Sequence, residues 1–254
     1  MTSTELPWRS SPLELDLSPD RVQIWHADLN HLWRPIDRWY ELLSPDERQR
    51  ADRFLRPVDC HSFVTARGVL RELLGRYLNL EPKQIEFGYT ERGKPFILNG
   101  DRPLSLEFNL SHSGGVALYA IACHRRVGID VESHRDLEVL SLARRFFSER
   151  EYDRLCEIPP ERQTEAFYSI WTAKEALLKA TGEGLIGLSR TEIALTDSEF
   201  APMSIALSSV PPAWHLQPLK LGPGYSGAVA IEGKKCHLDY YALSFASSVT
   251  QETR

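Results

Sequence analysis

The sequence predicts an α+β protein made of two halves that meet near residues 123–127. Two observations support this expectation. Apolar residues recur at helical spacing in one stretch of each half, and elsewhere they alternate with polar residues as in a strand. With 254 residues, the chain is long enough for one large domain or two small ones with substantial cores. We expect residues 1–125 and 126–254 to form the two halves.

The first half is predicted to begin with one strand followed by two helices. Val22–Ala27 has the composition of a strand, and the first twenty residues, rich in Ser, Pro and Leu, are expected to be extended. Ser44 is a typical N-cap, with proline at the first helical position and Glu47 in a capping box. A longer helix is predicted from about Asp59 to Leu78. Its apolar stripe includes Phe63, Val64, Leu70, Leu73, Leu74 and Tyr77.

Two short segments with turn chemistry precede the middle of the chain. Gly93–Pro95 follows the short segment Ile85–Tyr89, and its glycine and proline are typical of a turn with an exposed lysine between them. Phe108–Gly115 leads into the strand Val116–Ala122, and a turn before that strand is the structural interpretation.

The neighbouring residues Ser111 and His112 suggest nucleophilic catalysis at first sight. Adjacent side chains on an extended chain point to opposite faces, however. The sequence also has no Gly-x-Ser-x-Gly motif, which would place a nucleophilic serine on a sharp turn. We therefore favour a binding role for this pair.

The segment Val127–Glu132 has the period of a strand and carries two carboxylates. Asp130 and Glu132 are two residues apart, so they leave the strand on one face, ~6.6 Å apart at Cα. Such carboxylates repel each other unless a positive charge lies between them. With Glu175 as a third oxygen ligand, the set suits Mg²⁺, which binds through a few carboxylates plus phosphate oxygens. The alternative is a solvated strand edge whose acids discourage aggregation.

A second long helix is predicted in the second half. One face is the apolar stripe, and Trp171, Glu175 and Lys179 follow one another at i, i+4 and i+8 on a different face. Gly182 stands where a left-handed residue ends a helix. Taken alone, the Glu175–Lys179 pair is an ordinary surface ion pair. The stripe consists of Phe167, Ile170, Ala173, Leu177 and Ala180.

Another helix is predicted to start at Ser148, with Glu151 as its capping-box partner. This role fully explains Glu151 in structural terms. Beyond Gly182, short antiparallel strands are expected, followed by a polar tail from Ser244 that can be disordered. The expected strands are Ile193–Leu195, Ser204–Leu207, Trp214–Leu219 and Gly227–Ile231.

The composition is that of an ordinary water-soluble globular protein, with 42% hydrophobic and 26% charged residues. The net charge of −5 argues against nucleic acid as a partner. The longest apolar run, Val116–Cys123, is too short to span a bilayer, and Met1–Arg9 has no apolar signal region. The four cysteines are widely spaced without metal-ligand patterns, so reduced thiols in the cytoplasm are expected.

Four motifs, taken together in their order, resemble the signature of the 4′-phosphopantetheinyl transferases. They are Gly-Lys-Pro at 93–95, Phe-Asn-Leu-Ser-His-Ser at 108–113, Val-Gly-Ile-Asp-Val-Glu at 127–132, and Trp-x-x-Lys-Glu-Ala-x-x-Lys-x-x-Gly at 171–182. The resemblance covers roughly residues 35–232. Chain length and motif spacing resemble the long, surfactin-synthetase-activating (Sfp) type.

This resemblance implies a pseudo-two-fold α+β monomer of two similar subdomains with coenzyme A in the cleft between them. Residues 1–125 would bind the adenosine and 3′-phosphate side, and residues 126–254 would hold the metal and the catalytic groups. The implied activity is Mg²⁺-dependent transfer of phosphopantetheine from coenzyme A to a serine of an acyl or peptidyl carrier protein. Such carriers are generally acidic around that serine, so a basic or apolar docking patch is expected.

The resemblance also implies roles for individual residues. Arg50 falls near a position that meets the 3′-phosphate, and Arg53 or Arg67 substitutes for basic residues that this sequence lacks nearby. Ser111 and His112 would bind the same phosphate. The loop that contains Lys94 and Pro95 would contact the adenosine end of coenzyme A.

In the implied mechanism, Asp130, Glu132 and Glu175 hold the metal against the pyrophosphate. Lys179 binds coenzyme A and neutralises charge on the bridging or leaving oxygen. Glu151 or a metal-bound water takes the serine proton. Two alternatives stay open: a non-catalytic module that binds coenzyme A or carrier proteins, and another coenzyme A enzyme such as an acyltransferase. Neither would need the three acids.

Overall fold

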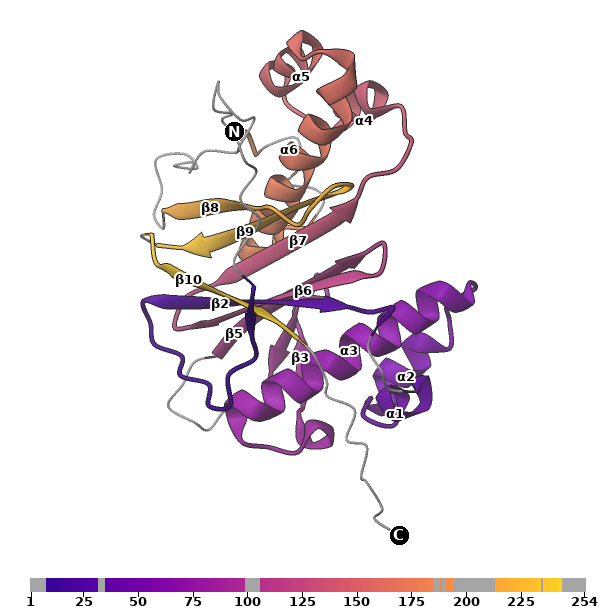
Figure 1. Cartoon of the computed structure of the whole chain (residues 1–254), viewed down its shortest axis with the longest axis vertical. Helices are drawn as coiled ribbons and strands as arrows, with labels where there is room; N and C mark the ends of the chain where they lie inside the picture. Colours follow the sequence, from indigo (N-terminus) through magenta and orange to yellow (C-terminus); the bar gives the residue numbers. More distant parts are fainter. Residues whose placement is uncertain are drawn as a thin grey trace.

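The computed structural model describes residues 8–31, 35–98, 106–184, 188, 191–193, 213–233 and 235–243. It combines helices and sheets, which confirms the α+β class (Figure 1). In chain order, the elements are β1 (Arg9–Ser10), β2 (Arg21–Asp28), α1 (Ile36–Tyr40), α2 (Pro45–Ala51), α3 (Pro57–Leu78), η1 (Pro82–Gln84), β3 (Phe87–Tyr89), β4 (Pro95–Ile97), β5 (Leu106–Ser113), β6 (Val116–Cys123), β7 (Val127–Ser133), α4 (Val139–Phe146), α5 (Glu149–Glu157), α6 (Pro160–Thr181), β8 (Trp214–Leu219), β9 (Tyr225–Glu232) and β10 (His237–Ala242).

The first half is a five-stranded sheet covered by α3. The strand order is β1-β10-β2-β6-β5, and β2, β6 and β5 are antiparallel neighbours. The predicted helices at Ser44 and near Asp59 are confirmed as α2 and α3, and the capping box of Ser44 and Glu47 is present. All predicted stripe residues of α3 except Tyr77 are buried. Tyr77 is half-buried and accepts a 2.9 Å hydrogen bond from the indole of Trp25.

The second half is a three-stranded antiparallel sheet, in the order β7-β9-β8, packed against α6. The predicted strand of residues 127–132 is confirmed as β7, and the helix ends at Gly182 with the expected left-handed φ of 78°. The predicted apolar stripe of α6 is buried. Helix and strand approach very closely at Gly128, where a Cβ atom would lie 2.0 Å from the carbonyl oxygen of Ala176.

The two halves meet through the faces of their sheets that are turned away from the long helices. On β6, Tyr119 and Ile121 belong to the core under α3, whereas Leu118 and Ala120 face the second sheet. There they pack with apolar residues of β7 and β9. Each half therefore has a helix of 22 residues on the outer face of its sheet, which confirms the expected two-half arrangement.

The segment around Ser111 and His112 differs from its structural interpretation. Residues 106–113 form a full strand, β5, paired with β6 over its whole length. The turn is confined to Gly114 and Gly115, whose φ angles of 57° and 86° favour glycine. The polar residues of this motif break the apolar alternation that would have predicted a strand. Some of them line a cavity described below.

The last described strand, β10, was not predicted from the sequence. It lies parallel to β2 and between β1 and β2, so the chain returns from the second half into the first sheet. The division at residue 125 remains a prediction, but β10 belongs to the first sheet. Strands Trp214–Leu219 and Gly227–Ile231 are confirmed as β8 and β9.

Several expectations fall wholly or partly outside the described residues. These are the strand of residues 204–207, the tail from residue 244, and residues 194–195 of the strand expected from Ile193, which is itself not in a strand. No helix in the described ranges is long and apolar enough to cross a membrane. All four cysteines are free thiols.

Candidate active site

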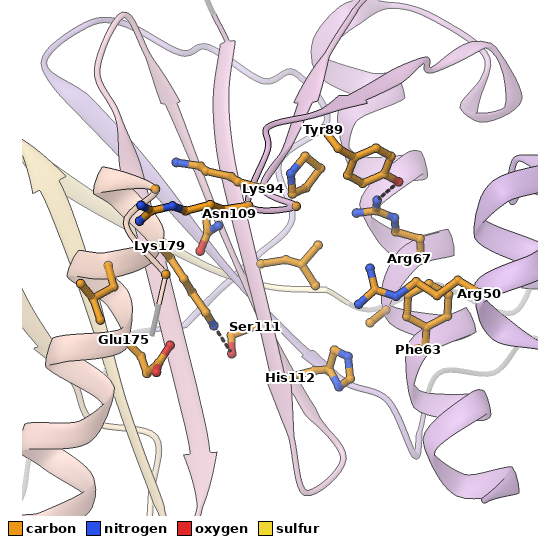
Figure 2. Close-up of a pocket in the computed structure, with 18 residues that line it drawn as sticks. Arg50, Phe63, Arg67, Tyr89, Lys94, Asn109, Ser111, His112, Glu175 and Lys179 are labelled. Carbon is orange, nitrogen blue, oxygen red and sulfur yellow. Dashed lines mark hydrogen bonds between the residues drawn. The ribbon is translucent and has the colours of Figure 1, made fainter. Parts of the chain in front are cut away.

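A cavity of about 410 Å³ lies between the two halves. Figure 2 shows its walls: α2 and α3 on one side, β5 across the middle, the β3–β4 turn above, and α6 on the other side. Predicted site residues of both halves line it. Those of the first half are Arg50, Arg67, Lys94, Pro95, Ser111 and His112. Glu175 and Lys179 line it from the second half.

Cationic and nitrogen-containing side chains dominate the first-half wall. Arg50 is exposed and lies over the ring of Phe63, 5.1 Å from its centre. His112 points toward this corner from β5 (Figure 2). Burial lowers the pKa of His112, and the positive charges of Lys179 and Arg50 lower it further. A polyanion that entered the cavity would relieve this repulsion and favour the protonated imidazole.

Lys94 has a structural role that the sequence did not indicate. The predicted turn is confirmed at Gly93, whose φ is 81°, and it carries Lys94 toward the second half. The ammonium group donates to the carbonyl oxygens of Val127, at 3.5 Å, and Ala180, at 3.3 Å. Burial lowers the pKa of Lys94. The turn is therefore fastened to the start of β7 and the end of α6.

The arginines named from the sequence are placed differently from one another. Arg67 lines the cavity, but its guanidinium donates to the buried carboxylate of Glu47 at 2.6 Å and to Tyr89 at 2.8 Å. Arg71 donates to the same carboxylate at 2.6 Å. Arg53 is exposed and does not line the cavity. Arg50 is thus the arginine of the three that is free of a buried ion pair and lines the cavity.

A ladder of side-chain hydrogen bonds connects β5 to the acidic strand β7. Asn109 accepts from the backbone N–H of Ile129 at 2.8 Å, and Ser111 donates to Asp130 at 2.8 Å. Ser113 donates to Glu132 at 2.8 Å. Alternate residues of one strand thus meet successive parts of the other. The ladder fixes the orientation of both predicted metal-ligand carboxylates.

Lys179, on α6, contacts the carboxylate of Asp130. Its ammonium lies 2.6 Å from Asp130. It also donates to the hydroxyl of Ser111 at 3.0 Å (Figure 2). Its side chain is 29% exposed, so part of it faces the cavity. The i, i+4 pair with Glu175 is therefore not a simple surface pair, because both residues line the cavity and Lys179 contacts Ser111 and Asp130.

Two of the three acids retain an unsatisfied oxygen. One oxygen each of Asp130 and Glu175 is buried without a hydrogen-bond partner among the residues that the structure describes. Burial and the charges of Asp130 and Glu132 raise the pKa of Glu175 to about 7, although Lys179 opposes the shift. Burial and Asp130 also raise the pKa of Glu132. Unpartnered, mutually repelling carboxylate oxygens are the donor set that fits a hard divalent cation.

Within the described ranges, these acids do not form a gathered metal centre. Lys179 instead contacts Asp130 directly. The metal assignment of Asp130, Glu132 and Glu175 therefore remains a prediction, supported by the unpartnered oxygens.

Because the pKa of Glu175 is raised, we expect the stability of the fold to depend on pH. The folded pKa of about 7 exceeds the ordinary value of 4.5, so the folded state favours the protonated form. Stability from this group is present below pH 4.5 and is lost as pH rises through 7. In EDTA, we expect Glu175→Gln to gain melting temperature relative to the wild type between pH 6 and 8. Glu183→Gln, which alters an exposed carboxylate just beyond α6, is the control; a pH-independent difference for Glu175→Gln would contradict the shift.

Glu151 is buried and serves as the predicted cap. Its carboxylate accepts from the backbone of Ser148 at 2.8 Å and from Ile193 at 2.6 Å, and it pairs with Lys174 at 2.5 Å. The capping box is therefore confirmed. Glu151 does not line the cavity, and both its oxygens have partners. These contacts favour the structural role; the role as a base remains untested.

Lys174 was not singled out from the sequence. It is completely buried, and burial lowers its pKa against the opposing charge of Glu151. Its place in Trp-x-x-Lys-Glu was the available signal, but its position on the helix gave no reason to expect a charged partner in the core.

Glu151→Gln separates the two roles of this residue. The variant leaves the Lys174 ammonium buried without a charged partner, and we expect a loss of about 3–5 kcal/mol in the free energy of unfolding. At a temperature where it is folded, the variant should keep kcat within about fivefold, because a lost general base would cost roughly 10²–10⁴-fold. Thermal unfolding and single-turnover rates measure both effects. Ser148→Ala, which removes only the cap hydroxyl, should cost about 1 kcal/mol.

The comparisons with known proteins agree with the motifs. A model of the 4′-phosphopantetheinyl transferase superfamily matches residues 126–231, and one of the N-terminal part of 4′-phosphopantetheinyl transferases matches residues 31–124. The 4′-phosphopantetheinyl transferase HetI of Nostoc sp. is 43% identical over 231 residues, covering 89% of this chain and 94% of HetI. The 4′-phosphopantetheinyl transferase Sfp of Bacillus subtilis is 31% identical over 193 residues, covering 76% of this chain and 84% of Sfp.

A solved structure, the holo-[acyl-carrier-protein] synthase of Thermotoga maritima, covers 43% of this chain and 63% of its own, with 24% identity and a TM-score of 0.32. This score is too low to support a statement about the fold. The sequence identity to HetI, over nearly the whole of both chains, is sufficient to assign this chain to the family. The chain belongs to the 4′-phosphopantetheinyl transferases, and its relatives are of the Sfp type.

Proposed function

We propose that this transferase moves the 4′-phosphopantetheine arm of coenzyme A to a serine of apo acyl or peptidyl carrier proteins, releasing adenosine 3′,5′-bisphosphate. One observation carries the proposal. The cavity between the halves has cationic groups on its first-half wall and, beyond them, carboxylates with unpartnered oxygens beside Lys179. A ligand with an anionic nucleotide end and a reacting pyrophosphate matches that order of charges.

The first-half wall would bind the nucleotide end of coenzyme A. Arg50 and His112 lie at one corner of the cavity, where the 3′-phosphate would receive charge-assisted hydrogen bonds (Figure 2). The turn with Lys94 and Pro95 would contact the adenosine. In this proposal, Arg67 has a structural role in the cavity wall, where it forms an ion pair with Glu47.

The second-half wall would carry the reaction. The serine hydroxyl gives its proton to a water molecule as its oxygen forms a bond to the β-phosphorus of coenzyme A. The bond from that phosphorus to the bridging oxygen of the adenosine bisphosphate breaks. Negative charge then develops on the leaving oxygen, and the ammonium of Lys179 is placed to neutralise it. Ser111 and Asp130 hold Lys179 in position. Positioning and charge neutralisation explain why no enzyme nucleophile is needed.

Asp130, Glu132 and Glu175 would hold Mg²⁺. When bound, the cation supplies positive charge to the pyrophosphate oxygens. The unpartnered oxygens of Asp130 and Glu175 support this assignment.

The decisive experiment is mass spectrometry of an apo carrier protein incubated with the enzyme, coenzyme A and Mg²⁺, with and without EDTA. We expect a mass gain equal to one phosphopantetheine that disappears with the chelator. Transfer of an acyl group alone would leave the adenosine bisphosphate on coenzyme A and identify an acyltransferase. No gain across fatty-acid, polyketide and peptide carriers would leave a binding module, an alternative that no observation favours.

We also propose that the enzyme acts as a monomer in the cytoplasm. Both walls of the cavity come from one chain, so no second copy is needed to complete it. The four free thiols suit a reducing compartment.

A further inference from the structure

The loop between α2 and α3 presents an unusual concentration of exposed apolar side chains. Phe54, Leu55 and Val58 are 37%, 98% and 60% exposed, respectively. Arg53 and Arg56, which flank Phe54 and Leu55 in the chain, are also exposed. We call these five residues the rim patch. In Figure 1, this end of α3 extends past the strands of its sheet, at the right of the view.

The fold does not explain why these apolar side chains face solvent. Most apolar residues of α3 are buried against the sheet, but Val58 is on its first turn and Leu55 precedes it. Phe54 is partly supported by the ring of Phe63, at 5.3 Å between centroids. Single exposed apolar residues are common on protein surfaces, whereas a contiguous group beside a functional site is typical of an interaction surface.

The rim patch is continuous with the wall of the cavity. The tilted rings of Phe54 and Phe63 are in contact, and Phe63 lines the cavity together with Arg50, which lies over its ring. A macromolecule that delivers a side chain into the cavity must rest on such a rim. Coenzyme A itself needs no apolar surface outside the cavity for its charged nucleotide end.

The charges of the rim patch select the partner. The whole chain has a net charge of −5, so an acidic partner is repelled by much of the enzyme surface. Arg53 and Arg56 place positive charge around the apolar side chains, although Arg56 also pairs with Asp59 at 2.9 Å. Local positive charge around an apolar centre is the complement of an acidic protein with an apolar helix face.

We propose that the rim patch is a docking contact for the acidic carrier protein. Leu55 and Val58 pack against an apolar surface of the carrier, and Arg53 and Arg56 face its carboxylates. This inference rests on the proposed function and assigns the docking surface that the sequence left unplaced. It also assigns Arg53 to the carrier instead of the 3′-phosphate.

The test is the double variant Leu55→Glu/Val58→Glu, which places two like charges before an acidic partner without disturbing the core. We expect the KM for apo carrier protein to rise by at least tenfold, while the KM for coenzyme A and the melting temperature stay unchanged. Leu13→Glu is the matched control, because Leu13 is 100% exposed in another segment and belongs to no site described above. Its KM values should equal those of the wild type.

A second measurement keeps binding separate from turnover. Calorimetric titration of the enzyme with adenosine 3′,5′-bisphosphate should give the same affinity for wild type and double variant. An unchanged KM for the carrier in the double variant would overturn the docking proposal, and a raised KM for coenzyme A alone would assign the patch to coenzyme A instead. If the wild-type enzyme modifies no carrier at all, the proposed function itself fails, and the docking proposal fails with it.

Discussion

Replacing Asp130 with alanine is expected to reduce phosphopantetheine transfer to below about 1% of the wild-type rate. This size of loss is typical when one charge contact to the transition state is removed. In this protein, one oxygen of Asp130 accepts hydrogen bonds from both Ser111 and Lys179. Its other oxygen is buried without a partner. The substitution therefore removes a cation ligand and releases Lys179 from its position.

The measurement that separates these effects is direct binding of Mn²⁺, used as a probe for the divalent cation, in the absence of coenzyme A. We expect Asp130→Ala to lose this binding, while Lys179→Ala keeps it and loses turnover. Asp136→Ala removes an equal charge from an exposed position of the same segment and should change neither. Full activity of Asp130→Ala in excess Mg²⁺ would refute the metal assignment.

The elements with strong periodicity were predictable from the sequence. The apolar stripe of α6, the alternation in β7 and the end of the helix at Gly182 are each fixed by residues close in the chain. The same local rules predicted that Glu175 and Lys179 share a face and that Asp130 and Glu132 share another. Glu175 and Lys179 both line the cavity, and Lys179 contacts Asp130.

The contacts that depend on distant parts of the chain were not predictable. β10 pairs with β2 across more than two hundred residues, and its short sequence gives no sign of a parallel partner. The strand nature of residues 106–113 was hidden, because Asn109, Ser111 and Ser113 direct polar side chains at β7 instead of solvent. Polar residues at buried positions weaken the apolar pattern on which strand prediction depends.

The burial of charged residues was also not predictable from the sequence. Glu47 is 1% exposed and accepts from both Arg67 and Arg71, so a helix cap and two apparently solvated arginines form one buried network. A helix cap is readable from sequence, but the second partner of its carboxylate is not. This is why the sequence offered Arg53 or Arg67 for the phosphate without indicating that the Arg67 guanidinium donates to Glu47.

Gly128→Ala is the second substitution for which we expect a large effect. The added Cβ would lie 2.0 Å from the carbonyl oxygen of Ala176 and 2.5 Å from the backbone nitrogen of Ala180. Both atoms belong to the main chain of α6, so no side-chain rotation can relieve the overlap. The helix must move away from β7, at a cost of about 3 kcal/mol or more in the free energy of unfolding. For a chain of this size, the melting temperature should fall by roughly 5–10 °C.

The displacement should impair catalysis beyond its effect on stability. Glu175 and Lys179 are on the part of α6 that packs against Gly128, and Asp130 is two residues along β7. A shift of about 1 Å between catalytic groups costs roughly 10²-fold in rate. We therefore expect kcat of the folded variant to fall by about that factor, measured well below its melting temperature.

Gly224→Ala is the control for adding a methyl group to a glycine. Gly224 has a φ of 81°, and no heavy atom of the described ranges lies within 4 Å of the added carbon, so the cost is confined to backbone strain of about 1–2 kcal/mol. Its kcat should equal that of the wild type. If Gly128→Ala lost stability but kept the wild-type kcat, the distance between α6 and β7 would not control the reaction. Since Lys179 meets Asp130 only across this contact, the mechanism proposed for Lys179 would then be wrong.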